Sequence, residues 1–147
     1  MISDFTKFFV TTTFLVVAMS GCATTYQPNT WTGGYKDYAL GNNTYEVWFG
    51  GNGHTKKDKV VEFALLRSAE VTLEKGFTYF TILESKTDSS YKYEYFSYSH
   101  TNIIQCFNED PVGIQTSIYN AKKIRNNLQK KYQLSYTRSI EDKGKLG

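Results

Sequence analysis

The sequence predicts an α+β domain with two layers, in which a three- or four-stranded, mostly antiparallel sheet carries two helices in the order β-α-β-β-β-α. Three observations lead to this class. Aromatic and β-branched residues gather in runs of strand length. Two other stretches repeat apolar residues every three or four positions, as amphipathic helices do. Gly-rich or Ser- and Asp-rich turns separate these segments.

The first half of the domain predicts a strand, a helix and a strand. Residues 44–49 are aromatic and β-branched and predict the first strand. Thr55 is the expected N-cap of a helix that Gly76 ends. Residues 77–83 predict the second strand. Because the links are short, the unit is expected to form a right-handed crossover.

The second half predicts two strands and a helix. A polar turn is expected at residues 86–90, followed by strands at 91–98 and 102–108. An apolar stripe then predicts a helix over residues 117–129. The domain as a whole is expected to span residues 35–132, and residues 133–147 to form a flexible C-terminal tail.

Residues 1–21 have the pattern of a lipoprotein signal peptide. A short polar start with Lys7 precedes an apolar run that is shorter than the roughly 20 residues needed to span a bilayer. The Ser20-Gly21-Cys22 sequence that follows resembles a lipobox. We expect cleavage before Cys22 and lipid, including palmitate, on this cysteine, since two or three acyl chains anchor a protein stably. The alternatives are an ordinary secreted protein cut near Gly21 and a buried helix.

Residues 22–34 are polar and punctuated by Pro and Gly, which predicts a flexible tether between the membrane and the domain. The residue after Cys22 is Ala23 rather than Asp, which resembles the sorting pattern of outer-membrane lipoproteins. We therefore expect a location in the cell envelope, with the protein held on the periplasmic side of the outer membrane.

Charge and cysteine content restrict the partners. The net charge of +3 is mildly basic and lacks the clustered basic stripe of a nucleic-acid binder, so no nucleic-acid partner is expected. If Cys22 carries lipid, Cys106 has no partner in the chain, and a disulfide framework is excluded. Within the first helix, Arg67 is expected outside the apolar stripe, where it can pair with Glu70.

Several segments resemble a family of small bacterial lipoproteins of unknown function. The similar segments are Gly-Gly-Tyr at 33–35, Asn-Gly at 52–53, the helix string at 64–74, Gly-Phe-Thr-Tyr-Phe at 76–80 and the closing helix at 118–128. The family more often has aspartate at the position of Asn120. The resemblance covers roughly residues 33–132. It implies an envelope location and a fold, and it provides no catalytic residues.

A Gly-rich loop joins the first strand to the first helix and is a candidate binding site. A strand-to-helix loop can hold an anion, or a partner, because its free amides and the helix dipole point toward the ligand. The alternative is a turn that only lets helix and strand pack closely. The candidate residues are Gly51, Asn52, Gly53, His54 and Thr55.

A second candidate is an aromatic face. Tyr91, Tyr93 and Tyr95 alternate along the strand predicted at 91–98 and should share one face. Such a tyrosine face could bind a sugar or the edge of a protein. It could equally cover a small core while its hydroxyls stay in water.

These features predict a membrane-anchored envelope lipoprotein with a non-catalytic binding or structural domain. The expected partners are the membrane, through the lipid on Cys22, and an envelope protein or a cell-wall glycan. No cofactor or metal site is expected, because His54, His100 and Cys106 lack any metal-ligand spacing. The alternative is a small envelope hydrolase or thiol enzyme that uses His100 and Cys106.

Overall fold

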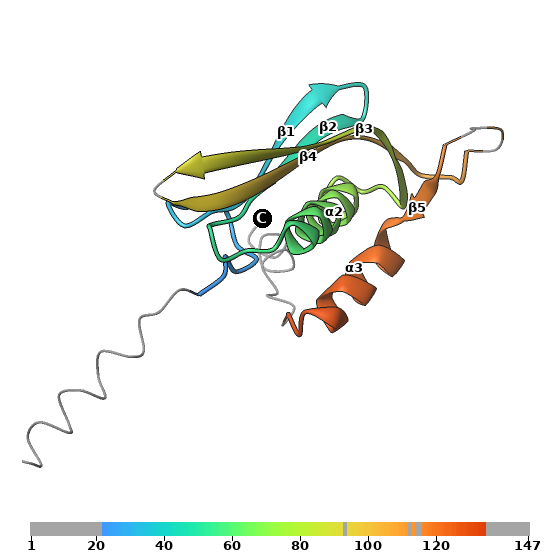
Figure 1. Ribbon diagram of the computed structural model, residues 1–147. Coiled ribbons are helices and arrows are strands. Elements are labelled where there is room, and N and C mark those ends of the chain that lie inside the picture. Colours follow the sequence, from blue (N-terminus) through green and yellow to red (C-terminus); the bar gives the residue numbers. More distant parts are fainter. Residues whose placement is uncertain (1–21, 93, 112, 114–115, 135–147) are drawn as a thin grey trace, which may run out of the picture.

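The computed structural model describes residues 22–92, 94–111, 113 and 116–134. Figure 1 shows a curled sheet with one helix packed along its face and the second helix packed against the first. The predicted α+β class is confirmed, as is the order β-α-β-β-β-α, which runs from β2 to α3. The expected signal peptide at 1–21 lies outside the described residues, and so does the expected tail from residue 135 on.

The sheet has five strands rather than three or four, in the order β1-β2-β4-β3-β5. The strands are β1 (Gly34–Gly41), β2 (Thr44–Gly50), β3 (Tyr79–Lys92), β4 (Tyr95–Phe107) and β5 (Ile118–Asn120). Neighbouring strands are antiparallel throughout, so β2 and β3 run parallel to each other with β4 between them. The strand that sequence analysis missed, β1, lies at the edge and is mostly exposed, so its sequence lacks the apolar alternation of a strand packed on a core.

The long β3–β4 hairpin differs from the expected arrangement. The polar turn expected at 86–90 is part of β3, and so are the first two residues of the strand expected at 91–98. The rest of that segment, from Tyr95 on, forms the single strand β4 together with the strand expected at 102–108. The chain reverses instead near Glu94, which has a φ of 67°. Polar residues can stay extended here because Ser85 and Thr87 hydrogen-bond across the hairpin to His100.

The helices are α2 (Lys57–Glu74) and α3 (Ala121–Lys131). The N-cap of α2 is Lys56, without a side-chain cap, so the expectation that Thr55 caps this helix is wrong. The helix expected to start near residue 117 begins at Ala121, because β5 occupies the preceding residues. Asn120 ends β5 and caps α3 by accepting a hydrogen bond from the amide of Lys123 at 3.0 Å.

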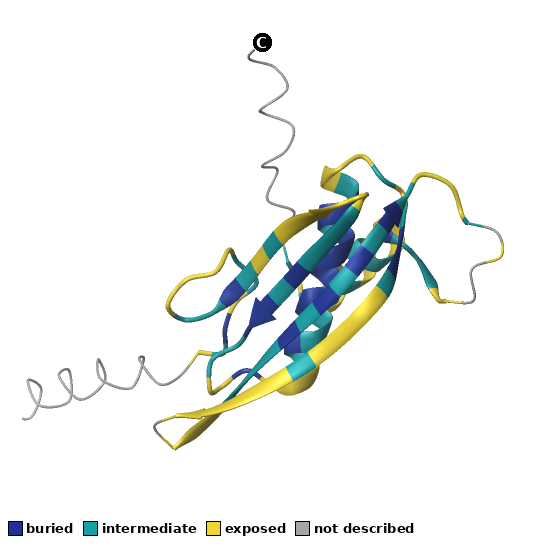
Figure 2. Cartoon of the chain, turned by 90° about the horizontal axis from the view of Figure 1, so that it is seen from above, coloured by how far each residue is buried: buried dark blue, intermediate teal, exposed yellow. Residues whose placement is uncertain are grey.

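The core lies between the sheet and α2, and Figure 2 shows buried positions alternating along the central strands. One cluster of buried residues comprises Val47, Ala69, Val71, Phe80, Ile104, Cys106 and Ala121. A second comprises Phe49, Val60, Phe63 and Ala64. Among the described residues, neither helix is long and apolar enough to cross a membrane.

The segment expected to be a flexible tether is packed against the domain. The buried Thr24 donates its amide to Thr55 Oγ1 and accepts the amide of Asn52 on its own Oγ1, each at 2.8 Å. The ring of Tyr26 packs edge-on against Phe63, with 5.2 Å between ring centroids. The tether prediction for residues 22–34 is therefore wrong. The prediction failed because a polar, Pro-containing segment can still accept hydrogen bonds from loop amides and cover the core with one aromatic ring.

Candidate functional site

The expected lipid-bearing residue, Cys22, is exposed and lies beside the Gly-rich loop. The side-chain amide of Asn52 donates to the carbonyl oxygen of Cys22 at 2.9 Å. Two residues later, Thr24 is buried. No flexible segment therefore separates Cys22 from the packed part of the domain.

Most backbone amides of the Gly-rich loop are already bonded within the protein. The amides of Gly51, Asn52, His54 and Thr55 already donate to protein oxygens at 2.8–3.1 Å. A Cβ on Gly51 would lie 2.7 Å from the Thr55 Cβ and 2.8 Å from a methyl of Val60, so glycine lets the loop and helix approach closely. This geometry favours the alternative of a close-packing turn over an anion site.

The predicted tyrosine face does not form. Tyr91 lies on β3 opposite Phe96, whereas Tyr95 lies on β4 opposite Lys92. Directly paired residues share a face and neighbours alternate, so Tyr91 and Tyr95 point to opposite faces. Tyr93 lies outside the described residues. The prediction failed because it placed the tyrosines on one strand, whereas the hairpin turn falls between them.

His100 and Cys106 both lie on β4, but they are not brought together. Six positions along an extended strand separate them by about 20 Å. Cys106 is buried, its sulfur lies 3.4 Å from Thr72 Oγ1, and burial raises the pKa of its thiol. This is the environment of a structural thiol rather than of a nucleophile, which needs a lowered pKa.

His100 belongs to a buried polar cluster of its own. Asn102 Oδ1 and Ser85 Oγ each lie 3.0 Å from Nε2, and Thr87 Oγ1 lies 2.7 Å from Nδ1. Because Asn102 Oδ1 can only accept, Nε2 carries the hydrogen and Thr87 donates to Nδ1, which satisfies the neutral ring. Burial lowers the pKa of His100 from its ordinary value of 6.5.

This lowered pKa predicts a loss of stability in mild acid. The unfolded chain takes up a proton on His100 at a higher pH than the folded chain does, so the contribution to stability is present above the unfolded pKa and is lost as the pH falls through the folded value. Between about pH 7 and about pH 5, native protein should lose more unfolding free energy than the His100→Gln variant. Urea unfolding at both pH values measures this difference, and equal losses would contradict it.

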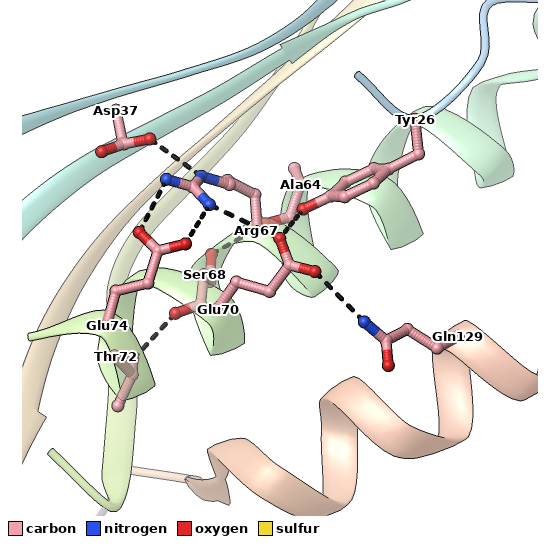
Figure 3. A network of polar contacts seen from close by, with 9 residues as sticks. All are labelled: Tyr26, Asp37, Ala64, Arg67, Ser68, Glu70, Thr72, Glu74 and Gln129. Carbon is pink, nitrogen blue, oxygen red and sulfur yellow. Dashed lines mark hydrogen bonds and ion pairs between the residues drawn. The ribbon is translucent and has the colours of Figure 1, made fainter. Parts of the chain in front are cut away.

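A network of charges joins the N-terminal segment, β1 and α2, and Figure 3 shows its members. Arg67 donates through Nε to Asp37 at 2.8 Å and through both terminal nitrogens to Glu74 at 2.8 and 3.0 Å. Its contact with Glu70, the expected partner, is longer at 3.5 Å. The Tyr26 hydroxyl donates to Glu70. The expectation that Arg67 lies outside the buried stripe is wrong, since it is 9% exposed.

Burial shifts the pKa values of residues in this network. Burial raises the pKa of Glu70, which the hydrogen bond from Tyr26 and the charge of Arg67 partly offset. Burial and the charge of Glu70 raise the pKa of Tyr26. Burial disfavours the charge on Arg67, but its hydrogen bonds to Glu74 and Asp37 raise its pKa overall. The spacing of Arg67, Glu70 and Glu74 at i, i+3 and i+7 is the sequence signal that could have revealed this cluster.

An open hollow of about 470 Å³ lies on the sheet face away from the helices. Trp48 faces this side because it alternates with the buried Val47 and Phe49. Its ring lies over Gly50, where a Cβ would come within 2.2 Å of the indole. Residues from the N-terminal segment, the Gly-rich loop and the β3–β4 hairpin complete the walls, among them Trp31, Asn52, Asp88, Ser97 and Ser99. Sequence analysis nominated neither tryptophan.

Among the described residues, no group of three or more His, Cys, Asp or Glu side chains lies close enough together to hold a metal ion. Comparison of the chain with protein-family models, curated proteins and solved structures finds no match. The resemblance to a family of small bacterial lipoproteins therefore stays a prediction.

Proposed function

We propose that this chain is a bacterial envelope lipoprotein, cut before Cys22 and lipidated on that cysteine, whose domain is a non-catalytic binding or structural module. The observation that carries the proposal is Cys22 itself. It follows a signal-like apolar segment and a Ser-Gly pair, and its side chain is exposed at the edge of the domain. An acyl group on this sulfur leaves the core undisturbed.

The rest of the domain supports a module that stands without disulfides. Its second cysteine, Cys106, contributes to the buried core instead of to a crosslink. The separation of His100 from Cys106 supports binding over thiol chemistry. The proposed partner of the domain is an envelope protein or a cell-wall glycan.

Replacing Cys22 by serine in the full chain tests the proposal. Cells fed labelled palmitate should incorporate no label into the Cys22→Ser variant, which should accumulate as an unprocessed or soluble form, because a hydroxyl does not replace the thiol as lipid acceptor. The matched control is Cys106→Ser, which should keep both label and membrane association. Label on the Cys22→Ser variant, or its loss from the folded Cys106→Ser variant, would contradict the proposal.

A further inference from the structure

The end of the molecule that carries Cys22 also gathers exposed aromatic side chains. Figures 1 and 2 both show the tip of the β3–β4 hairpin at the same end as the segment that starts at Cys22. Four of the exposed large apolar or aromatic residues lie here: Trp31 (97% exposed), Tyr91 (60%), Tyr95 (59%) and Phe96 (56%). We refer to these four residues and Cys22 as the anchor end.

Direct contacts hold the parts of the anchor end together. Asn52 binds the carbonyl of Cys22, and the next residue, Gly53, lies against Tyr95, where a Cβ would come within 2.8 Å of the tyrosine Cβ. The hydroxyl of Thr24 donates at 2.8 Å to the carbonyl of Thr32, the neighbour of Trp31. The segments that carry these aromatic side chains are therefore held in place relative to the cysteine.

A lipid on Cys22 would bring this surface to the bilayer. A long flexible tether would let an anchored domain stand away from the membrane and turn freely. Here the carbonyl of Cys22 is already bonded to the domain and Thr24 is buried. The domain surface next to Cys22 must consequently lie at the level of the lipid headgroups.

The side chains at this surface suit that environment. Tryptophan and tyrosine are enriched where a membrane meets water, because their rings are apolar and their polar groups stay hydrated. Tyr91 and Phe96 occupy one face of the hairpin tip, with 4.7 Å between ring centroids, and Tyr95 occupies the other. A tip with aromatic rings on both faces can enter the headgroup layer edge-on.

Charge at the anchor end is compatible with anionic lipid. Three lysines, Lys56, Lys57 and Lys92, are exposed around the loop and the tip. Asp58 and Glu94 are exposed beside them and offset part of this charge. Basic residues near a membrane surface are attracted to anionic headgroups.

We propose that the anchor end lies in the headgroup layer of the bilayer that holds the lipid on Cys22, with Trp31 and the hairpin tip inserted among the headgroups. The inference rests on the proposed lipidation of Cys22. It adds a fixed orientation, in which the β1–β2 turn at the opposite end of the sheet faces away from the membrane.

The test uses the full chain, purified from membranes and reconstituted in vesicles of phosphatidylcholine and phosphatidylglycerol with brominated acyl chains, which quench tryptophan fluorescence at short range. Both native tryptophans are first replaced by phenylalanine. A single reporter is then introduced by Tyr95→Trp at the hairpin tip or, as the matched control, by Tyr38→Trp on β1, where the native tyrosine is 56% exposed. We expect several-fold stronger quenching with Tyr95→Trp than with Tyr38→Trp.

Vesicle flotation and the acyl mass of the same samples separate this inference from the proposed function. Equal quenching of the two reporters in protein that floats with the vesicles would overturn the orientation and leave the anchor intact. Protein that lacks acyl mass and does not float would overturn both. Stronger quenching with Tyr38→Trp would mean that the opposite end faces the bilayer, and would likewise overturn the proposal.

Discussion

Replacing Arg67 by alanine is expected to lower the free energy of unfolding by about 3 kcal/mol, at the lower end of the range for breaking a buried ion pair. The variant leaves the carboxylates of Asp37, Glu70 and Glu74 close together without their shared cation. Since these side chains are 16–29% exposed, water relieves part of the repulsion. Urea unfolding at neutral pH measures the loss.

The exposed pair between Lys131 and Glu62 is the matched control. Its nitrogen and oxygen are 2.7 Å apart, but the lysine side chain is 56% exposed. Lys131→Ala should therefore cost less than about 1 kcal/mol. If the Arg67→Ala variant loses no more than this control, the network does not stabilise the fold as its geometry indicates.

The second large effect is expected at Tyr26, in the segment that was predicted to be a tether. Tyr26→Ala should lower the free energy of unfolding by about 3 kcal/mol, as for other large-to-small aromatic substitutions in a core. The ring contacts Tyr35 and Phe63 and the hydroxyl donates to Glu70, so both apolar and polar contacts are lost. Thermal and urea unfolding of the purified variant measure the effect.

Two further variants separate the contribution of the Tyr26 ring from that of its hydroxyl and from that of the neighbouring chain. Tyr26→Phe keeps the ring and removes only the hydroxyl, so its loss should be smaller, about 1.5 kcal/mol, which is the lower end of the range for a hydrogen bond to a charged group. Thr25→Ala changes an exposed neighbour and should be close to neutral. A flexible tether would make all three substitutions neutral, which would contradict the packing of this segment.

The fold class could be predicted from the sequence because periodicity is a local property. The strand at Thr44–Gly50 buries alternate residues, and its aromatic and β-branched content indicates it. The helix at Lys57–Glu74 repeats apolar residues every three or four positions, although it lies between the sheet and α3 and is buried on more than one side. The edge strand β1 could not be recognised in this way, since exposed edge positions impose no alternation. The reversal at Glu94 was missed because tyrosine and lysine on both sides favour a continuous strand, whereas pairing across the hairpin decides where the turn falls.

The candidate site could likewise be predicted only where its sequence signal is local. Cys22 was nominated from a contiguous motif, and its exposure is compatible with that role. The surroundings of Cys22 depend on tertiary contacts, such as that between Cys22 and Asn52, which are 30 positions apart. No local pattern indicates that Trp31 and the tip near Tyr95 lie at the same end of the molecule as the cysteine. The Arg67 network was underestimated for a related reason, because Asp37 and Tyr26 come from outside the helix.

Mass spectrometry of the mature N-terminus of protein extracted from membranes tests the central claim most directly. We expect the first residue to be Cys22, with the added mass of a diacylglyceryl group and, where the amine is also acylated, of a further acyl chain. An unmodified N-terminus at any other residue would contradict the lipoprotein proposal and, with it, the orientation proposed for the anchor end.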